Sequence, residues 1–256
     1  MRALRAAFVA SFALVQIAAA EWQVVSSDNE PSTIAGVQHR HVVANESGTG
    51  HRATMELAVF SSKTATLRVI DDPPESHTRL AETMQRESCI AGVNGGYFDP
   101  EYAPVGLLIS EGRVVSPLRK ARLLSGVVSV VKGRVQIQRP AEFSMKAKPA
   151  AARQCGPFLV NGGKPIAGLN DTRAARRTFV ATSSGDRAAI GYCSHVTLAQ
   201  LGALLAAPGL ASEFKTQRAL NLDGGSSSGF WFAGQNGPFS ISEQKGVRDY
   251  LAVVVK

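Results

Sequence analysis

The chain has 256 residues, 45% of them hydrophobic and 19% charged, and its formal net charge at pH 7 is +8. This length is sufficient for one large or two small domains with a buried core. The lysines and arginines are scattered, without a long basic run or interleaved aromatic residues, which argues against nucleic-acid binding. A basic chain of this kind favours a phosphorylated small substrate or an anionic glycan as its partner.

Residues 1–20 have the pattern of a secretory signal peptide. Two arginines precede an apolar run over residues 6–17, and small residues end at a cleavage site after Ala20. The apolar run is short for an uncleaved membrane anchor, and no later segment is long and apolar enough to span a bilayer. We therefore predict a periplasmic or secreted protein whose mature chain, residues 21–256, carries a formal charge of +6 and spans no membrane.

The mature chain contains three cysteines, Cys89, Cys155 and Cys193. An exported protein can pair two of them and leave one over, and we hypothesise a disulfide between Cys155 and Cys193, although the sequence does not determine connectivity. The chain has no Cys-x-x-Cys motif and no histidine pair at ligand spacing, so no zinc site is predicted.

Apolar stretches bounded by turn residues predict strands over most of the chain. Residues 21–50 are compatible with one or two strands, and residues 140–153, which show no clear period, with a loop or weak helix. The later strands are expected at residues 54–60, 65–71, 89–93, 105–110, 113–115, 124–131, 134–138, 154–160, 178–182, 187–193, 219–222 and 251–255. The first two of these form a hairpin or two successive strands.

Two helices are expected. The first covers residues 76–88 with Ser76 as its N-cap, and the second covers residues 198–207, where Thr197 and Gln200 form a capping box before a stripe of leucines. A helix that leads directly into a buried strand favours a layered arrangement. The predicted fold class is α+β: a mixed, mostly antiparallel β-sheet packed with a few helices in a single catalytic domain.

The stretch from Ala219 to Ser228 places a carboxylate beside a flexible loop. Asp223 follows a short buried strand, and Gly224 and Gly225 permit positive φ, so the backbone can present a concave row of N–H groups. Three serines, Ser226, Ser227 and Ser228, add hydroxyls. The pattern suits phosphate binding next to acid/base or nucleophilic chemistry. The alternative is a polar turn with an aspartate cap.

A second stretch, Asn94-Gly95-Gly96-Tyr97-Phe98, follows another buried strand. Asn94 offers a donor and an acceptor, Gly95 and Gly96 allow close backbone approach, and Tyr97 and Phe98 offer flat surfaces against which a sugar can lie. The alternative is a tight Asn-Gly turn with both aromatic rings in the core.

Two further residues are candidates with competing structural explanations. Gln154 stands at the entrance of a strand, where it can bond either a backbone group or a substrate. Arg177 ends a basic cluster at the start of another strand. It can form a bidentate phosphate clamp, or it can be a solvated surface arginine.

Taken together, these stretches resemble the phosphodiester glycosidase family. The resemblance covers residues 89–256 and lies in six blocks in the same order: Asn94-Gly95-Gly96-Tyr97-Phe98, Gly106, Gln154-Cys155-Gly156-Pro157, Arg177-Thr178, Thr197-Leu198 and Asn221-Leu222-Asp223-Gly224-Gly225-Ser226-Ser227. Two departures bear on substrate choice. Ser226 replaces the family's usual third glycine, and Phe179-Val180-Ala181 follows Thr178 where the family has two apolar residues and a glycine.

The resemblance implies a hydrolase that splits the glycosidic C1–O bond of a sugar-1-phosphodiester. Arg177 and the amides of residues 224–227 would hold the phosphate, Asp223 would act as base or as nucleophile, and Asn94 and Gln154 would orient the substrate. A phosphate is a good leaving group, so cationic groups can replace much of the protonation that other glycosidases require.

No cofactor is required by this mechanism, although a divalent cation at Asp223 is compatible with its hard oxygen ligands. A different class of function is also open: a non-catalytic envelope protein that binds an anionic polysaccharide through its basic face. A serine hydrolase using Ser226 to Ser228 is disfavoured, because no suitable histidine accompanies these serines.

Overall fold

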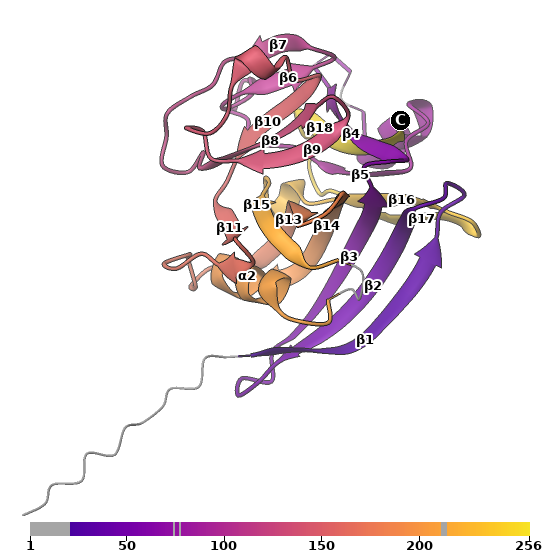
Figure 1. The fold of residues 1–256 in the computed structure, drawn as a ribbon, viewed down its shortest axis with the longest axis vertical. Helices are drawn as coiled ribbons and strands as arrows, with labels where there is room; N and C mark the ends of the chain where they lie inside the picture. Colours follow the sequence, from indigo (N-terminus) through magenta and orange to yellow (C-terminus); the bar gives the residue numbers. More distant parts are fainter. Residues whose placement is uncertain (1–20, 74, 77, 211–213) are drawn as a thin grey trace, which may run out of the picture.

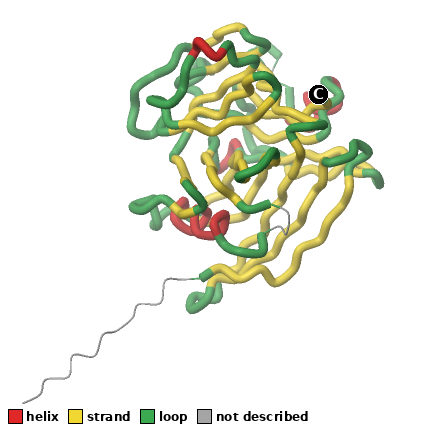
Figure 2. Tube along the Cα trace, in the orientation of Figure 1, coloured by secondary structure: helices red, strands yellow, loops and turns green. Residues whose placement is uncertain are grey.

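The computed structural model describes residues 21–73, 75–76, 78–210 and 214–256. These residues form three antiparallel β-sheets with two short helices, so strands dominate the fold (Figures 1 and 2). The expected α+β fold built on antiparallel sheet is thus confirmed in its coarse form, and no parallel pair occurs among the described strands. The predicted signal peptide, residues 1–20, lies outside the described residues.

The largest sheet has eight strands and carries both the N-terminal strands and the central strands of the molecule (Figure 1). In spatial order these are β1 (Trp22–Pro31), β2 (Val37–Glu46), β3 (Arg52–Ser61), β14 (Arg187–Val196), β13 (Ala175–Ser183), β15 (Thr216–Asn221), β11 (Phe158–Asn161) and β12 (Lys164–Pro165).

Two five-stranded sheets complete the fold. One contains β7 (Arg113–Ser116), β6 (Leu108–Ser110), β10 (Ala151–Cys155), β8 (Gly126–Val131) and β9 (Arg134–Gln138). The other contains β17 (Gly237–Ile241), β16 (Phe230–Gly234), β5 (Ala91–Asn94), β18 (Asp249–Val255) and β4 (Ala65–Asp71). The helical segments are α1 (Leu80–Arg86), α2 (Leu198–Ala206) and the short 3₁₀ turns η1 (Met145–Ala147) and η2 (Gly225–Ser227).

The core lies between the three sheets, and a second apolar layer lies under α2. Alternation along β13 sends Val180 into the central core and Phe179 to the α2 side, because successive side chains point to opposite faces. Leu201, Leu204 and Leu205 of α2 pack on this second face. Each contributes about 1.5–3 kcal/mol through burial. The capping box predicted at Thr197 and Gln200 is present at the start of this helix.

The predicted disulfide is wrong. All three cysteines are free and buried. Cys155 packs in the core between the sheets, whereas Cys193 packs in the layer under α2. The two thiols therefore lie on opposite faces of the large sheet, and burial raises the pKa of each to about 12.

Local differences from the predicted elements have clear causes. Ser76 does not cap α1: the helix begins after Arg79, while the Ser76 hydroxyl bonds the Asp72 carboxylate. Strands β3 and β4 are successive but belong to different sheets. Strand β10 begins at Ala151, within the range expected to be a loop or weak helix, because the buried Arg153 interrupts its apolar pattern. The single strand expected over residues 154–160 is divided between the end of β10 and the start of β11. None of the described helices is long and apolar enough to cross a membrane.

Candidate active site

Two neighbouring strands deliver the main polar side chains to one pocket. Strands β13 and β15 pair antiparallel with Phe179 opposite Asn221, so the start of β13 and the loop after β15 meet at the same edge. Arg177 lies near the start of β13, and Asp223 lies in the loop that follows β15. The pocket between them measures about 220 Å³ and is lined by Tyr97, Arg173, Ala175, Arg177, Leu198, Asn221, Asp223, Gly224 and Gly225.

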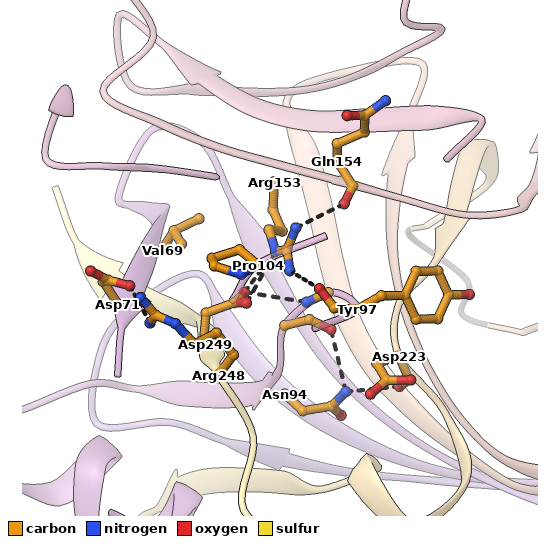
Figure 3. A network of polar contacts seen from close by, with 12 residues as sticks. Val69, Asp71, Asn94, Tyr97, Pro104, Arg153, Gln154, Asp223, Arg248 and Asp249 are labelled. Carbon is orange, nitrogen blue, oxygen red and sulfur yellow. Dashed lines mark hydrogen bonds and ion pairs between the residues drawn. The ribbon is translucent and has the colours of Figure 1, made fainter. Parts of the chain in front are cut away.

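The backbone of Asp223 is fixed from three sides. Its carbonyl oxygen accepts hydrogen bonds from Asn94 Nδ2 at 2.8 Å and from Thr178 Oγ1 at 2.8 Å. Its N–H donates to the Gly95 carbonyl at 3.1 Å. Figure 3 shows Asn94 directed at the Asp223 segment. Asn94 is 1% exposed and its Oδ1 accepts from the Gly229 N–H, so its side chain holds the loop and does not line the pocket.

Burial raises the pKa of the Asp223 carboxyl above its ordinary value, because removing a carboxylate from water disfavours the ionised form. The Ser227 hydroxyl, the Lys245 ammonium and the Gly224 N–H oppose this and lower the pKa, and the Asp249 carboxylate raises it further. The Gly224 N–H donates to Asp223 Oδ1 at 2.9 Å. A carboxylate whose pKa is raised in this way is a stronger base than an aspartate in water.

The loop after Asp223 presents free backbone donors beside the carboxylate. Gly225 has φ +67°, a left-handed conformation that turns the chain into η2. The N–H groups of Ser227 and Ser228 bond back to the carbonyls of Gly224 and Gly225. The N–H groups of Gly225 and Ser226 have no acceptor within the described ranges, so two adjacent donors are available to an anion.

Arg177 is anchored by part of its guanidinium and leaves the rest for the pocket. Its Nε donates to the Val196 carbonyl at 3.2 Å and its Nη2 to the Arg173 carbonyl at 2.7 Å. Its Nη1 faces Gly224, where an added Cβ would lie 3.5 Å away. The side chain is buried, which lowers the pKa of Arg177. The exposed Arg173 adds a second guanidinium at the rim.

Asn221 and Tyr97 also line the pocket with polar atoms. The Tyr97 hydroxyl donates to the Gly156 carbonyl at 2.5 Å, and Asn221 Nδ2 donates to the same carbonyl at 3.0 Å. Burial raises the pKa of Tyr97, so the phenol stays protonated. Asn221 is 2% exposed and its Oδ1 has no partner among the described residues. A buried acceptor without a donor is costly, and a ligand hydroxyl would satisfy it.

A buried ion pair supports the Asn94–Tyr97 loop from behind (Figure 3). Arg153 and Asp249 are both fully buried, with Arg153 Nε 3.0 Å from Asp249 Oδ1. Arg153 also donates to the carbonyls of Tyr97, Val105, Leu107 and Gln154. A Cβ on Gly95 would lie 1.7 Å from Asp249 Oδ1, and one on Gly96 would lie 2.5 Å from Arg153 Cζ. These two glycines therefore permit close approach of the ion pair rather than of a substrate.

The prediction that Gln154 orients a substrate is corrected by its contacts. Gln154 is fully buried and does not line the pocket. Its Oε1 accepts from the N–H groups of Leu107 and Arg119, and its Nε2 donates to the carbonyls of Arg119 and Leu124. The side chain therefore joins backbone segments by hydrogen bonds, which is the alternative to substrate binding that the sequence analysis gave for Gln154.

Three more predicted residues, Phe98, Ser226 and Ser227, do not line the pocket. The ring of Phe98 packs at a tilt against the ring of Tyr102, with 5.0 Å between the ring centroids, and the Lys245 ammonium lies 4.9 Å from the centroid of the Phe98 ring. Ser226 is exposed, and its carbonyl accepts from the backbone of Gln244 and Lys245. Ser227 is fully buried.

Sequence reasoning missed four lining residues, Arg173, Ala175, Leu198 and Asn221. Asn221 stands two positions before Asp223 on a buried strand, and an amide at such a position was a usable signal. Arg173 belongs to the same basic cluster as Arg177. Leu198 stands in the Thr197-Leu198 block of the family resemblance, whereas Ala175 gives no signal in sequence, because only the tertiary arrangement brings it to the pocket.

The part of the chain that the structure describes holds no group of three or more His, Cys, Asp or Glu side chains placed to bind a metal ion. Asp223 is the only acidic side chain among the lining residues of the pocket. A divalent cation held between Asp223 and a substrate phosphate therefore stays a prediction.

Comparisons with known proteins find a matching family and similar folds. A family model described as phosphodiester glycosidase matches residues 87–254. The catalytic domain of zebrafish N-acetylglucosamine-1-phosphodiester alpha-N-acetylglucosaminidase, auto-inhibited by its pro-peptide, superposes with a TM-score of 0.65 at 13% identity, covering 91% of this chain and 88% of that one. The crystal structure of a hypothetical protein from Synechocystis superposes with a TM-score of 0.64 at 12% identity, covering 92% of this chain and 68% of that one. No curated protein matches the chain by sequence.

Proposed function

Since the chain belongs to the phosphodiester glycosidase family, we propose that it is an exported hydrolase acting on a sugar-1-phosphodiester. The bond cleaved is the sugar C1–O bond, and the products are a free sugar and a phosphomonoester. The observation that carries the proposal is the shared pocket of Asp223 and Arg177, which sets a carboxylate of raised pKa beside a partly free guanidinium.

The phosphate would lie between the arginines and the loop after Asp223. Arg177 Nη1 and the Arg173 guanidinium supply positive charge, and the N–H groups of Gly225 and Ser226 supply directed donors. These groups stabilise the negative charge that develops on the leaving oxygen, so the reaction does not need a second carboxyl group as general acid.

Asp223 acts as general base in this proposal. It removes a proton from water, the water oxygen forms a bond to C1, and the C1–O bond to phosphate breaks with its electron pair on the phosphate oxygen. One carboxylate is sufficient for such a single displacement. In a two-step mechanism, by contrast, Asp223 would be bonded to the sugar in the intermediate, and a second group would have to act as base toward water. The expected product has inverted anomeric configuration; a retained product would assign Asp223 as the nucleophile.

The sugar would contact Tyr97 and Asn221. The unpartnered Asn221 Oδ1 accepts a hydrogen bond from a sugar hydroxyl, and the Tyr97 ring gives it a flat surface. Asn94, whose polar atoms are occupied by the Asp223 and Gly229 backbone, acts as a positioning residue.

Hydrolysis in ¹⁸O-labelled water tests the proposal. The purified mature chain is incubated with a uridine-diphosphate sugar or a sugar-1-phosphate alkyl diester, and the products are followed by ³¹P NMR and mass spectrometry. The proposal expects a phosphomonoester without label and a sugar that carries one ¹⁸O atom. Label in the phosphate would show P–O cleavage and overturn it. Binding of an anionic polysaccharide without turnover of any diester would instead favour the non-catalytic envelope protein.

A further inference from the structure

A second polar hollow lies at the opposite end of β13 and β15 from the candidate active site. It measures about 310 Å³ and lies between strand β9 and the turn that joins β13 to β14. Its lining includes three arginines, Arg134, Arg187 and Arg218, brought together from three separate strands. Nothing in the proposed reaction uses these side chains.

Further cations surround the hollow. Lys256 Nζ donates to the carbonyl of Ser62, a lining residue, and the Lys256 side chain lies against Gly133 in the turn before Arg134. We name this region the basic corner. It comprises five basic and two acidic residues: Lys63, Arg134, Arg187, Arg218, Lys256, Asp186 and Glu142.

The charges of the basic corner are only partly neutralised. Glu142 pairs with Arg218 at 2.6 Å, and Asp186 lies 3.7 Å from Lys63. Arg134 and Arg187 have no ion pair and no side-chain hydrogen bond within the described ranges. Two free guanidiniums at a concave, polar surface attract a multiply charged anion and can bond its oxygens in pairs.

The corner is too far from the active site for one small substrate to reach both. Thr182, which lines the hollow, is five residues from Arg177 along β13. Strand geometry puts their Cα atoms roughly 17 Å apart. That separation exceeds the length of a single sugar phosphate, whereas a polymer with an anionic group on each unit can span it.

We propose that the basic corner is a second anion-binding site, which holds a phosphate group of a phosphodiester-linked glycan polymer. This inference rests on the proposed function for the identity of the polymer, but the site itself binds without catalysis. Arg134 and Arg187 make the phosphate contacts, and Arg218, held by Glu142, lines the same hollow.

The test measures binding in an Asp223→Asn background, so that its outcome does not depend on turnover. A poly(glycosyl phosphate), in which phosphodiesters join successive sugars, is titrated by calorimetry against three proteins. They are that variant, the same variant with Arg134→Ala and Arg187→Ala, and a matched control with Arg52→Ala and Lys164→Ala, which removes the same charge from exposed positions elsewhere. The proposal expects affinity to fall about tenfold or more in the Arg134/Arg187 variant and less than about twofold in the control.

Equal losses in both variants, or no loss in either, would overturn the proposal, because they would indicate general electrostatic attraction or no site. Polygalacturonate provides the second arm: if this carboxylate polymer binds as tightly and with the same sensitivity to Arg134→Ala and Arg187→Ala, the assignment to phosphate is wrong. Diester hydrolysis by the Arg134→Ala/Arg187→Ala chain with Asp223 intact should match the wild type on a monomeric substrate. A chain that binds the polymer through Arg134 and Arg187 yet hydrolyses no diester would contradict only the proposed function.

Discussion

The pocket around Asp223 and the ion-pair network around Arg153 lie side by side but differ in how their polar atoms are used. In the network, Arg153 bonds Asp249 and four backbone carbonyls, and Gln154 bonds four backbone groups. In the pocket, part of the Arg177 guanidinium, Asn221 Oδ1 and two backbone N–H groups are free. Fully bonded groups build the scaffold, and the unbonded ones are available to a ligand.

The comparison predicts that substitutions in the pocket act on turnover and substitutions in the network act on stability. The strongest case is Asp223→Asn. Losing a general base should lower kcat by about 10²–10⁴-fold. Initial rates of phosphomonoester release from the sugar diester measure this, and a folded variant with near-wild-type rates would remove Asp223 from the mechanism.

The same variant carries a stability prediction with a defined sign. Burial holds the pKa of Asp223 above its unfolded value, so ionising the carboxyl destabilises the fold as pH rises from the unfolded value through the folded one. Asparagine avoids this penalty. Asp223→Asn should melt at a higher temperature than the wild type at neutral pH, and the difference should vanish below about pH 3.9. Thermal scans across pH check both parts; a lower melting temperature at pH 7 would contradict them.

Arg153→Met tests the network. It leaves the Asp249 carboxylate buried without its partner, which should cost about 3–5 kcal/mol in the free energy of unfolding. Guanidinium denaturation measures the loss. The control is Lys63→Met, which removes the exposed pair with Asp186 and should leave the free energy of unfolding almost unchanged. Similar values for the two variants would show that the network does not support the fold.

Arg177→Ala should lower kcat/KM for a sugar phosphodiester by about 10²–10³-fold, as expected for losing one donor to the leaving group. The same change should have a much smaller effect on an aryl glycoside, which has no phosphate to bind. Parallel kinetics on both substrates make the comparison, and equal losses would exclude a phosphate-binding role.

Gln154→Leu sharpens the distinction between the two regions, because the sequence had suggested a substrate contact. The change leaves two buried backbone groups, the Leu107 N–H and the Leu124 carbonyl, without their Gln154 partners, each at about 1–3 kcal/mol. Stability should fall, while kcat/KM per folded molecule should stay unchanged at a temperature where the variant is folded. A rise in KM without a loss of stability would indicate that Gln154 contacts the substrate.

The smallest expected effect concerns Lys245. Its ammonium lowers the pKa of Asp223, so Lys245→Gln should raise that pKa further. The acid limb of the kcat/KM profile, which reports ionisation of the base in the free enzyme, should move to higher pH. A pH-rate profile from about pH 4 to 8 detects the shift; an unchanged limb would mean that it does not report Asp223.

The sequence predicted the strands well where apolar residues were continuous, and the pocket well where a motif followed a strand end. It identified Asp223, Arg177, Tyr97, Gly224 and Gly225, all of which line the pocket. It could not separate these from Asn94 and Gln154, because the same side chains serve either a ligand or the backbone, and only the tertiary contacts decide which. The buried Arg153–Asp249 pair shows the same limit: a charged residue inside a strand is recognisable only when its partner, 96 residues away, is in place.

The most direct measurement is a crystal structure of Asp223→Asn with an intact sugar-1-phosphodiester. The account predicts the phosphate within hydrogen-bond distance of Arg177 Nη1 and the Gly225 and Ser226 amides, with sugar C1 facing residue 223 and a sugar hydroxyl on Asn221 Oδ1. A diester bound with its phosphate away from Arg177, or with C1 turned from residue 223, would contradict it.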